Sequence, residues 1–334
     1  MSRTRARYDV LGIGNAIVDV IGHADDAFLA RHGIEKGAMT LIDTRRAESL
    51  YESMGPCVEI SGGSAANTMA GIASLGGQAA YVGRVRDDQL GQVFQHDIKA
   101  AGVHFATPPA EAGPPTARCL ILVTPDAQRS MNTYLGACVD LGPEDIDPAA
   151  IAEAEVTYLE GYLWDPPRAK EAFVRAAWAA HQAHRKVALS LSDAFCVDRH
   201  RESFQDLISG HVDLLFANES EILSLFSAVS FRQALDAVRG HCEVAVLTRG
   251  PRGAVVVAGD TVVEIPAEPL AHLVDTTGAG DLYAAGFLYG YTHGRTLADS
   301  ARFGAIAAAE IISHVGARPD ESLNALARQK GLLA

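Results

Sequence analysis

Short apolar segments alternate with helical patterns along most of this chain, and this alternation constrains the fold more than any other feature. Helical periodicity occurs at 65–75, 89–101, 167–184 and 231–239. Parallel neighbouring strands need crossover helices of this length, and such helices cover the faces of the sheet. We therefore predict an α/β fold whose mostly parallel sheet consists of the apolar segments 8–14, 79–83, 157–160, 187–191, 213–217 and 244–248.

Two stretches, residues 20–45 and 116–136, depart from this rhythm. Both carry extended patterns, and the second contains the turn Pro125-Asp126. We predict that these two insertions pair into a small β-sheet that forms a lid over the main domain. Residues 253–257 and 261–265 are expected to form a hairpin, followed by helices from about 280 to 328. The chain 1–334 is then a single domain with a lid.

Charge and cysteine content exclude several classes of protein. The net charge is −13 and no basic patch stands out, since Arg3, Arg5 and Arg7 are best explained as a solvated tail. A nucleic-acid partner is therefore not expected. The five cysteines are odd in number and lack Cys-x-x-Cys spacing, which argues against a disulfide framework or a zinc site. The apolar stretch 10–21 is interrupted by Asn15 and Asp19, so it is not a membrane span. We predict a cytoplasmic protein without a membrane partner, either a monomer or a homodimer.

The segment Asp275-Thr-Thr-Gly-Ala-Gly-Asp281 carries the strongest functional signal. A helix is expected to begin near Gly280, and the small residues Gly278, Ala279 and Gly280 let the backbone approach a ligand closely. Free amides at a helix start bind anions, and Asp281 just beyond them is placed to take a proton from an attacking hydroxyl. This pattern indicates phosphoryl transfer. The alternative is a tight turn in which Asp281 only favours the helix dipole.

Two further segments suggest contacts with a nucleotide. Asn218 and Glu221 follow a predicted strand, where they could position hydrated magnesium near the phosphates of ATP. The same pair also fits a helix N-cap with its capping-box partner, and both roles can hold together. Thr248, Gly250 and Gly253 join two apolar strands, where they could flank nucleotide phosphates or form an ordinary hairpin turn.

Two segments near the N-terminus suggest an acceptor site. Gly62 and Gly63 would permit close approach by a polyol, and Asn67 could donate to its hydroxyls and accept from them. The alternative is a plain strand-to-helix turn. Asn15 follows the first strand, and Asp19 is either a first-turn helix residue or an acceptor for a pair of substrate hydroxyls.

Two other nucleotide-binding classes fit poorly. Gly12-x-Gly14 after the first strand suggests a dinucleotide-binding dehydrogenase, but position 17 is Ile where the third glycine would stand. The chain also lacks the Gly-x4-Gly-Lys-Ser/Thr phosphate loop. A non-catalytic sugar-binding regulator on the same fold would have no use for a base at Asp281.

Together these segments resemble the ribokinase-like (PfkB) family of carbohydrate and nucleoside kinases, from Gly12 to about Gly316. The resemblance implies a three-layer α/β/α domain with a β-sheet lid, ATP as phosphoryl donor and magnesium as cofactor. It implies that Asp281 is the general base and that the amides of Gly278, Ala279 and Gly280 form the anion hole.

The resemblance also assigns the remaining site residues. The sugar hydroxyls would be contacted by Asn15, Asp19, Gly62, Gly63 and Asn67. Magnesium and phosphate would be ordered by Asn218 and Glu221, and the nucleotide loop would contain Thr248, Gly250 and Gly253. Many family members bind potassium or sodium behind the anion hole, to which Asp275 and Thr277 would contribute.

Within the family, three segments are more similar to adenosine-kinase-like members than to ribokinases: 14–19, 62–67 and 129–136. This favours a nucleoside phosphorylated at its 5′-hydroxyl, with adenosine first, and the candidates for a wall around its base are Tyr134, Leu135, Phe195 and Tyr162. Guanosine, inosine, ribose, fructose and other sugars stay open as acceptors.

Overall fold

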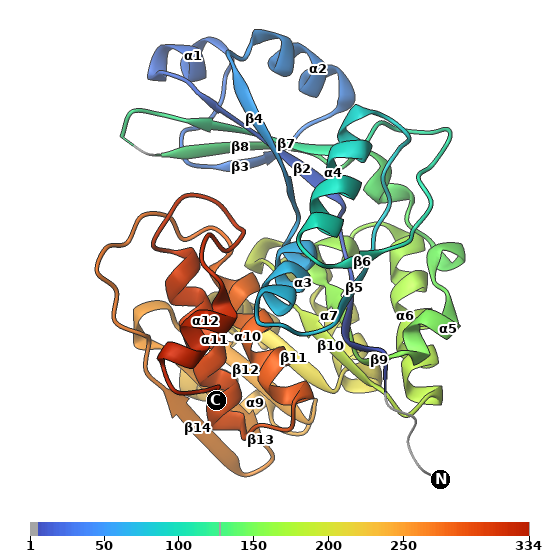
Figure 1. Ribbon diagram of the computed structural model, residues 1–334, viewed down its shortest axis with the longest axis vertical. Coiled ribbons are helices and arrows are strands. Elements are labelled where there is room, and N and C mark those ends of the chain that lie inside the picture. The colour runs from blue at the N-terminus through green and yellow to red at the C-terminus, as the bar shows by residue number, and fades with distance from the viewer. Residues whose placement is uncertain (1–5, 127, 334) are drawn as a thin grey trace.

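Two β-sheets organise the protein, a large one in the lower part of Figure 1 and a small one above it. The computed structural model describes residues 6–126 and 128–333, so Arg3 and Arg5 of the basic run lie outside the described residues. Within these residues the large sheet has nine strands in the order β14-β13-β12-β11-β10-β9-β1-β5-β6. They are β1 (Tyr8–Ile13), β5 (Ala79–Val82), β6 (His104–Phe105), β9 (Ala154–Glu160), β10 (Lys186–Ser190), β11 (Leu214–Asn218), β12 (Val244–Thr248), β13 (Ala254–Ala258) and β14 (Thr261–Ile265).

The large sheet is parallel from β6 through β12, and the hairpin β13–β14 adds an antiparallel edge. Side chains alternate between its two faces, so that Val10 enters one core and Leu11 the other. Because the carboxyl ends of parallel strands share one edge, the loops after β1, β9, β11 and β12 meet there. This edge faces the small sheet (Figure 1).

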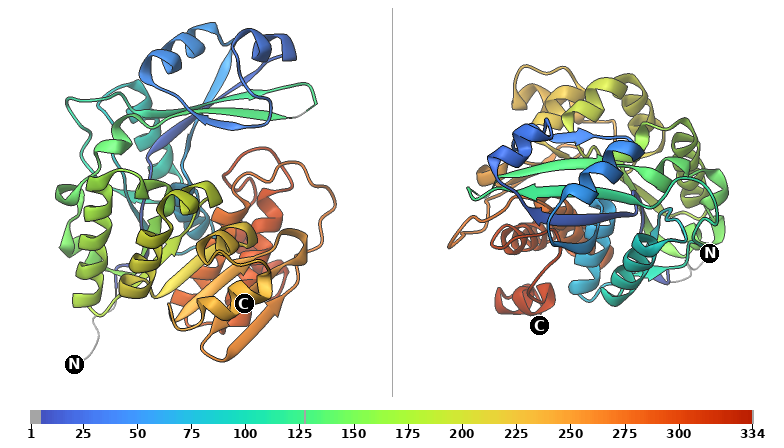
Figure 2. Two further views of the ribbon diagram at one scale, coloured as in Figure 1. Left: turned by 180° about the vertical axis from the view of Figure 1, so that it is seen from behind. Right: turned by 90° about the horizontal axis from the view of Figure 1, so that it is seen from above.

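Helices cover both faces of the large sheet. One face packs against α3 (Ser64–Ser74), α4 (Gln89–Ala100), α10 (Ala279–Thr292), α11 (Leu297–Ile311) and α12 (Leu323–Gln329). The other face, seen from behind in Figure 2, packs against α5 (Pro148–Ala152), α6 (Pro167–Gln182), α7 (Ala194–His211), α8 (Glu219–Leu225) and α9 (Phe231–Val238). Short 3₁₀ turns are η1 (Gly136–Asp140), η2 (Pro143–Asp145), η3 (Gly161–Trp164) and η4 (Gly250–Arg252). The predicted α/β/α architecture with a mostly parallel sheet is confirmed.

The small sheet has five strands among the described residues, in the order β3-β8-β7-β2-β4. They are β2 (Ile17–His23), β3 (Met39–Leu41), β4 (Cys57–Gly62), β7 (Ala117–Val123) and β8 (Arg129–Tyr134). One face packs under α1 (Asp26–Arg31) and α2 (Thr44–Ser53), through Leu29 and Leu50 against β2 and β7. The opposite face carries Asp19 and Arg129 and is turned toward the main domain.

The predicted small sheet from residues 20–45 and 116–136 is present, but the first stretch is only partly extended, because α1 lies inside it and α2 begins in it. Asp25 caps α1 by accepting from the amide of Phe28 at 2.7 Å, and Asp43 caps α2 by accepting from that of Arg46 at 2.8 Å. Each helix buries few residues, and its apolar spacing is too brief to separate a helical period from an alternating one. The small sheet also gains β4, which lies beyond the predicted insertion.

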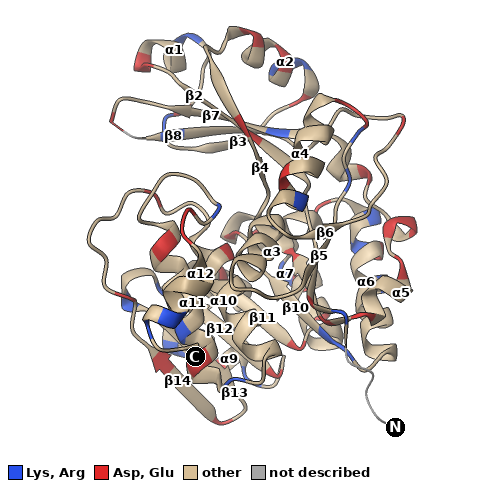
Figure 3. Ribbon diagram, viewed as in Figure 1, with Lys and Arg blue, Asp and Glu red and all other residues tan. Residues whose placement is uncertain are grey.

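Charged residues of both signs are mixed among the described residues. Lys and Arg are interspersed with Asp and Glu over both sheets and their helices (Figure 3). In the described part of the chain no helix is both long and apolar enough to cross a membrane. All five cysteines are free thiols.

Glycines set the distance between α10 and its two neighbours. A Cβ on Gly71 of α3 would lie 2.6 Å from Leu282 Cδ1, and one on Gly286 would lie 2.4 Å from the backbone of Phe303 in α11. Both distances are below van der Waals contact, so only glycine permits the observed approach. This close packing brings the N-termini of α3 and α10 together.

We expect Gly286→Ala to lower the free energy of unfolding by about 1–3 kcal/mol, because α10 and α11 would have to separate. Gly210→Ala is the control: Gly210 is an exposed residue of α7 with nothing within 4 Å of its Cβ position. That change should be neutral or stabilise by up to about 1 kcal/mol. Urea denaturation measures both. Equal effects of the two substitutions would contradict the packing argument.

Candidate functional site

Asp281 lies in the first turn of α10 and is held by side chains from α3. Its Oδ1 accepts a hydrogen bond from Ser64 Oγ at 2.6 Å, and its Oδ2 accepts from Asn67 Nδ2 at 3.0 Å. Burial raises the pKa of Asp281, while these two hydrogen bonds and the charge of Arg318 lower it. A carboxylate with a raised pKa is a stronger base, and this one is fixed in orientation by two donors.

The N-terminus of α10 presents its first amides beside this carboxylate. Gly278 precedes the helix with φ of 78°, a left-handed conformation that glycine adopts without strain. The helix then begins at Ala279, and helix geometry leaves the first amides without acceptors in their own helix. The helix dipole adds partial positive charge at the same place. The arrangement suits an anion next to Asp281.

The turn after β1 is anchored by a buried glutamate, Glu160, at the end of β9. Glu160 Oε1 accepts from Asn15 Nδ2 at 2.6 Å and from the Asn15 amide at 3.3 Å, and its Oε2 accepts from the Ala65 amide at 2.8 Å. The side chain is 1% exposed, and burial raises its pKa to about 7. Glu160 thus ties Asn15 to the N-terminus of α3.

Asp19 comes from β2 of the small sheet, where it stands opposite Ile60 of β4. A Cβ on Gly62 would lie 2.5 Å from Asp19 Oδ2, so the glycine makes room for this carboxylate. Burial raises the pKa of Asp19 to about 7, although the charges of Arg318 and Arg129 lower it. Asp281 is a further negative charge that acts on it. The two carboxylates therefore belong to one electrostatic site.

The turn between β4 and α3 requires glycine at position 63. Gly63 has φ of 93°, and a Cβ there would lie 2.2 Å from the backbone oxygen of Asn15. Asn67, one turn into α3, is 5% exposed and uses its amide nitrogen on Asp281. Its Oδ1 is buried without a hydrogen-bond partner in the described structure. An unpaired buried acceptor is costly, so this oxygen points to a ligand donor.

A second group of residues lies at the ends of β11 and β12. Asn218 and Thr248 are register partners on these parallel strands. Asn218 caps α8, and Glu221 completes the capping box, with its Oε1 and Oε2 accepting from Asn218 Nδ2 at 2.6 Å and from the Asn218 amide at 2.9 Å. The pKa of Glu221 is raised to about 7, mainly by burial and also by the charges of Asp193 and Asp281, while the hydrogen bond from the Asn218 amide lowers it. The capping role is therefore present, and the negative surroundings also fit a nearby cation.

The link between β12 and β13 follows Thr248 as the short turn η4. Gly250 lies open, while a Cβ on Gly253 would lie 2.0 Å from the Ile265 backbone oxygen. The Arg249 side chain is already engaged, because it pairs with Glu219 at 3.3 Å and stacks 3.9 Å from the Phe231 ring centroid, so it is not free to bind a phosphate. Only the backbone and Thr248 are left to face a nucleotide here.

Asp275 precedes the candidate anion-binding turn, residues 278–280, and both of its oxygens are engaged. Its Oδ1 accepts from the Thr277 hydroxyl at 2.8 Å and from the Thr277 amide at 3.1 Å. Its Oδ2 pairs with Arg129 of the small sheet at 2.8 Å and accepts from the Gly316 amide at 3.3 Å. A carboxylate neutralised in this way does not fit a directly bound potassium or sodium ion. It instead connects the small sheet to the main domain.

The four residues predicted to surround a base do not share one wall. Tyr134 is buried on the α2 side of the small sheet, where its hydroxyl accepts from Thr44 Oγ1 at 3.1 Å, so its prediction is wrong. Leu135 is half-buried just beyond β8, before η1. Burial raises the pKa of Tyr162, and so do the nearby negative charges of Asp193, Asp281, Glu221 and Glu160. Phe195, at the start of α7, is 76% exposed.

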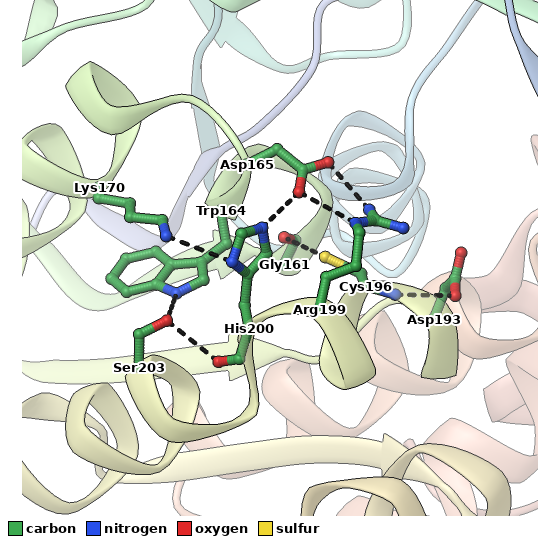
Figure 4. A network of polar contacts seen from close by, with 9 residues as sticks. All are labelled: Gly161, Trp164, Asp165, Lys170, Asp193, Cys196, Arg199, His200 and Ser203. Atoms are coloured by element: carbon green, nitrogen blue, oxygen red, sulfur yellow. Dashed lines mark hydrogen bonds and ion pairs between the residues drawn. The ribbon is translucent and has the colours of Figure 1, made fainter.

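A polar network fixes the loop that carries Tyr162 to α7 (Figure 4). Trp164 Nε1 donates to Ser203 Oγ at 2.9 Å, and His200 Nε2 lies 2.5 Å from Asp165 Oδ1. His200 sits where α7 departs from helical geometry. The network therefore anchors the loop that carries Tyr162 on α7, the helix that also carries Phe195.

Sequence reasoning missed several polar residues that contact the predicted ones. Ser64 directly follows the glycine pair and lies one turn from Asn67, so helical spacing could have identified it. Glu160, Arg129 and Arg318 are single charges in otherwise ordinary segments, and no local pattern marks them. Their places follow from strand order and from packing between distant elements.

Comparison with known proteins agrees with this geometry. The family model described as pfkB family carbohydrate kinase matches residues 43–323. The chain belongs to the pfkB family of carbohydrate kinases. It is therefore a phosphotransferase that uses ATP and an alcohol group as acceptor.

Solved structures and curated relatives of this pfkB-family kinase cover nearly its full length. Adenosine kinase from Sinorhizobium meliloti is 56% identical with a TM-score of 0.91, covering 97% of this chain and 100% of that one. A probable sugar kinase from Rhizobium etli is 54% identical with a TM-score of 0.92, covering 98% and 100%. Adenosine kinase 1 of Arabidopsis thaliana is 26% identical over 92% of this chain and 94% of that protein. Nucleoside and sugar kinases thus share this fold and sequence pattern.

The raised pKa of Glu160 predicts a pH-dependent contribution to stability. The folded protein binds the proton of the Glu160 carboxyl more tightly than the unfolded chain does. The contribution of Glu160 to the free energy of unfolding is therefore largest at acidic pH. It should decline by about 3 kcal/mol as pH rises from 4.5, the ordinary pKa of a glutamate, to about 7. We expect Glu160→Gln to remove this decline, as measured by urea denaturation at pH 5 and pH 7.5.

The exposed Glu171 of α6 offers the control substitution Glu171→Gln, which should leave the pH dependence as in the unchanged protein. A stability difference between Glu160→Gln and the unchanged protein that is the same at both pH values would contradict the assignment.

Proposed function

We propose that this kinase phosphorylates the 5′-hydroxyl of a nucleoside, with adenosine as the preferred acceptor. The observation that carries the proposal is the hydrogen-bonded junction of Asp281 with Ser64 and Asn67. Ser64 and Asn67 follow Gly63 within one helical turn, and their hydrogen bonds hold the Asp281 carboxylate next to this turn. A ribose whose secondary hydroxyls lie at Asp19 and Asn67 would direct its primary hydroxyl toward Asp281.

The acceptor side offers complementary groups for ribose hydroxyls. The Asp19 carboxylate accepts, and Asn67 Oδ1 is a free acceptor in the described structure. Gly62 and Gly63 let the Asp19 carboxylate and the Asn15 backbone approach this turn closely. Glu160 holds Asn15 in place beside them. These are the few fixed polar groups that orientation of a small ligand requires.

Exposed apolar side chains on the face of the small sheet that carries Asp19 support a nucleoside over a bare sugar. Met39, Leu41, Val58 and Ile60 are between 39% and 60% exposed. By strand pairing, Ile60 and Val58 share the face of Asp19 and Ile21, while Met39 and Leu41 share that of Met131 and Thr133. Tyr162 provides aromatic surface at the same site. A purine would cover such apolar area, whereas a sugar has only hydroxyls to offer it.

In the reaction, Asp281 accepts the proton of the attacking 5′-hydroxyl as its oxygen bonds to the γ-phosphorus of ATP. The first amides of α10 donate to the phosphoryl oxygens, and their dipole stabilises the charge that accumulates there. ADP leaves with the electron pair of the broken phosphorus–oxygen bond. The ends of β11 and β12, with Asn218, Thr248, Gly250 and Gly253, would hold the nucleotide.

Magnesium fits the nucleotide side, where Glu221 lies among negative charges from Asp193 and Asp281. Both Glu221 oxygens are used by Asn218, so the residue would hold a hydrated ion through water and not by direct ligation. A bound magnesium ion would neutralise charge on the phosphates. We derive no step through potassium or sodium, because Asp275 does not fit such an ion.

The small sheet would act as a lid over the acceptor. It supplies Asp19 to the acceptor site and Arg129 to Asp275, so its position decides whether the site is complete. Excluding water at this point strengthens the electrostatic contacts of Asp281 and the anion-binding amides.

An ADP-release assay across acceptors tests the proposal directly. We expect kcat/KM for adenosine to exceed that for guanosine, inosine, ribose and fructose by roughly 100-fold or more. Parallel reactions with and without potassium test the inference at Asp275. Preferential use of ribose or fructose would replace the nucleoside proposal with a sugar kinase.

The base assignment predicts the behaviour of Asp281→Asn. This variant should lose at least roughly 100-fold in kcat while ATP binding is unchanged, because proton removal alone is lost. Steady-state kinetics and ATP titration measure the two quantities. Asp260→Asn, in the exposed turn between β13 and β14, is the control. Near-normal turnover of Asp281→Asn would show that another group removes the proton.

A further inference from the structure

Arg318 reaches the acceptor site from the segment after α11. Gly316 donates to Asp275, and Ala317 packs 3.1 Å from the Cβ position of Gly278, so this segment lies against the anion-binding turn. From there Arg318 Nη2 donates to Ser61 Oγ at 3.2 Å. Ser61 directly precedes Gly62, whose Cβ position lies 2.5 Å from Asp19 Oδ2, so the guanidinium lies at the end of β4 that is next to Asp19.

Two of the three guanidinium nitrogens have no partner. Arg318 Nε and Nη1 are buried without a hydrogen bond in the described structure, and none of the ion pairs there includes this arginine. Leaving charged donors buried and unpaired costs free energy, so such atoms are rare without a ligand or water to meet them. Arg318 therefore retains donors for a group that enters the site.

The charges around Arg318 indicate which part of the site the entering group would occupy. The negative charges of Asp19, Asp97 and Asp281 act on Arg318, together with Tyr81. Asp19 and Asp281 lie at the two ends of the proposed acceptor, and Asp97 accepts from the Ser61 amide at 3.1 Å. Arg318 thus lies close enough to the carboxylate that would accept from the acceptor's hydroxyls for the two charges to act on each other.

Hydroxyl chemistry then requires a donor as well as an acceptor. A hydroxyl that gives its proton to Asp19 keeps two lone pairs on oxygen, and these need an N–H group once water is excluded. Two parallel N–H groups of a guanidinium match two oxygens on adjacent carbons, and the second proton of Arg318 Nη2 forms such a pair with a proton of Nε or of Nη1.

We propose that Arg318 is a specificity-determining residue that donates hydrogen bonds to the vicinal hydroxyl oxygens whose protons Asp19 accepts. The proposal rests on the proposed function, because it assumes that the acceptor's diol lies at Asp19. The acceptor is then a compound with hydroxyls on adjacent ring carbons, such as a ribonucleoside, and the enzyme discriminates against its deoxy analogues. A missing hydroxyl would leave the buried donors of Arg318 unpaired.

The test compares adenosine, 2′-deoxyadenosine and 3′-deoxyadenosine with the unchanged enzyme and with Arg318→Met. We expect Arg318→Met to lower kcat/KM for adenosine by roughly 100-fold. For at least one deoxy analogue, which already lacks the contact, the loss should be less than about 3-fold. An equal loss for all three substrates would overturn the proposal. That result would follow if water satisfies the arginine from the adjoining cavity of about 280 Å³ between α3, α4 and β4.

Arg318→Lys separates hydrogen bonding from charge. Lysine keeps the positive charge that acts on Asp19 but lacks the guanidinium fork. We expect it to discriminate against the deoxy analogues as poorly as Arg318→Met does, and full discrimination by lysine would overturn the proposal. Arg302→Met, an exposed arginine of α11 paired with Asp299, is the control and should match the unchanged enzyme. Melting temperatures show whether each variant is folded.

The experiment also separates this inference from the proposed function. If the unchanged enzyme does not phosphorylate adenosine, the nucleoside assignment fails and Arg318 is still open to test. The same variants are then compared on the sugar that the enzyme does use and on its deoxy analogue at one of two adjacent hydroxyls. Equal losses on that pair would overturn the role of Arg318 independently.

Discussion

The close approach of α3 and α10 is the constraint on which the site depends. Gly71 lets Leu282 and Ala285 pack directly on the α3 backbone, and Gly286 does the same for α10 against α11. With the helices at this distance, Ser64 and Asn67 reach Asp281 with hydrogen bonds of 2.6 and 3.0 Å. A larger separation between the helices would leave Asp281 without its two hydrogen-bond donors, so packing in the core fixes the geometry of the site.

The site concentrates carboxylates whose pKa values burial raises. Asp19, Glu160 and Glu221 are each raised to about 7, and Asp281 is raised as well. Ionisation of a buried carboxylate lowers the stability of the folded protein. Several such carboxylates together indicate a site that receives hydrogen-bond donors and cations. Arg318 and Arg129 are the positive charges that oppose this repulsion at Asp19. The stability of the fold and the binding of substrates therefore share one electrostatic cause.

Much of the fold was predictable because apolar strands and their helices repeat regularly. The six predicted strands and the β13–β14 hairpin are all present, and the parallel order brings Asn218 beside Thr248. Residues 20–45 were not predictable in detail, since α1 and α2 are short and their spacing resembles alternation. Tyr134 was assigned to the wrong face, because strand periodicity alone does not say which face meets the main domain. The cytoplasmic location and the oligomeric state stay predictions.

The sequence by itself determined the α/β class, the family and the chemically special positions, because glycine pairs, helix starts and isolated carboxylates are local features. Asp281 and its amides, the Gly62-Gly63 turn and Asn218 with Glu221 all belong to this set. Only the tertiary structure decided which polar groups meet. Glu160 joins Asn15 to Ala65, Arg129 joins the small sheet to Asp275, and Arg318 donates to Ser61 of the small sheet. Each of these contacts links residues that are far apart in the sequence. The sequence gives no local signal for such pairs, because they meet only when the strands and helices pack.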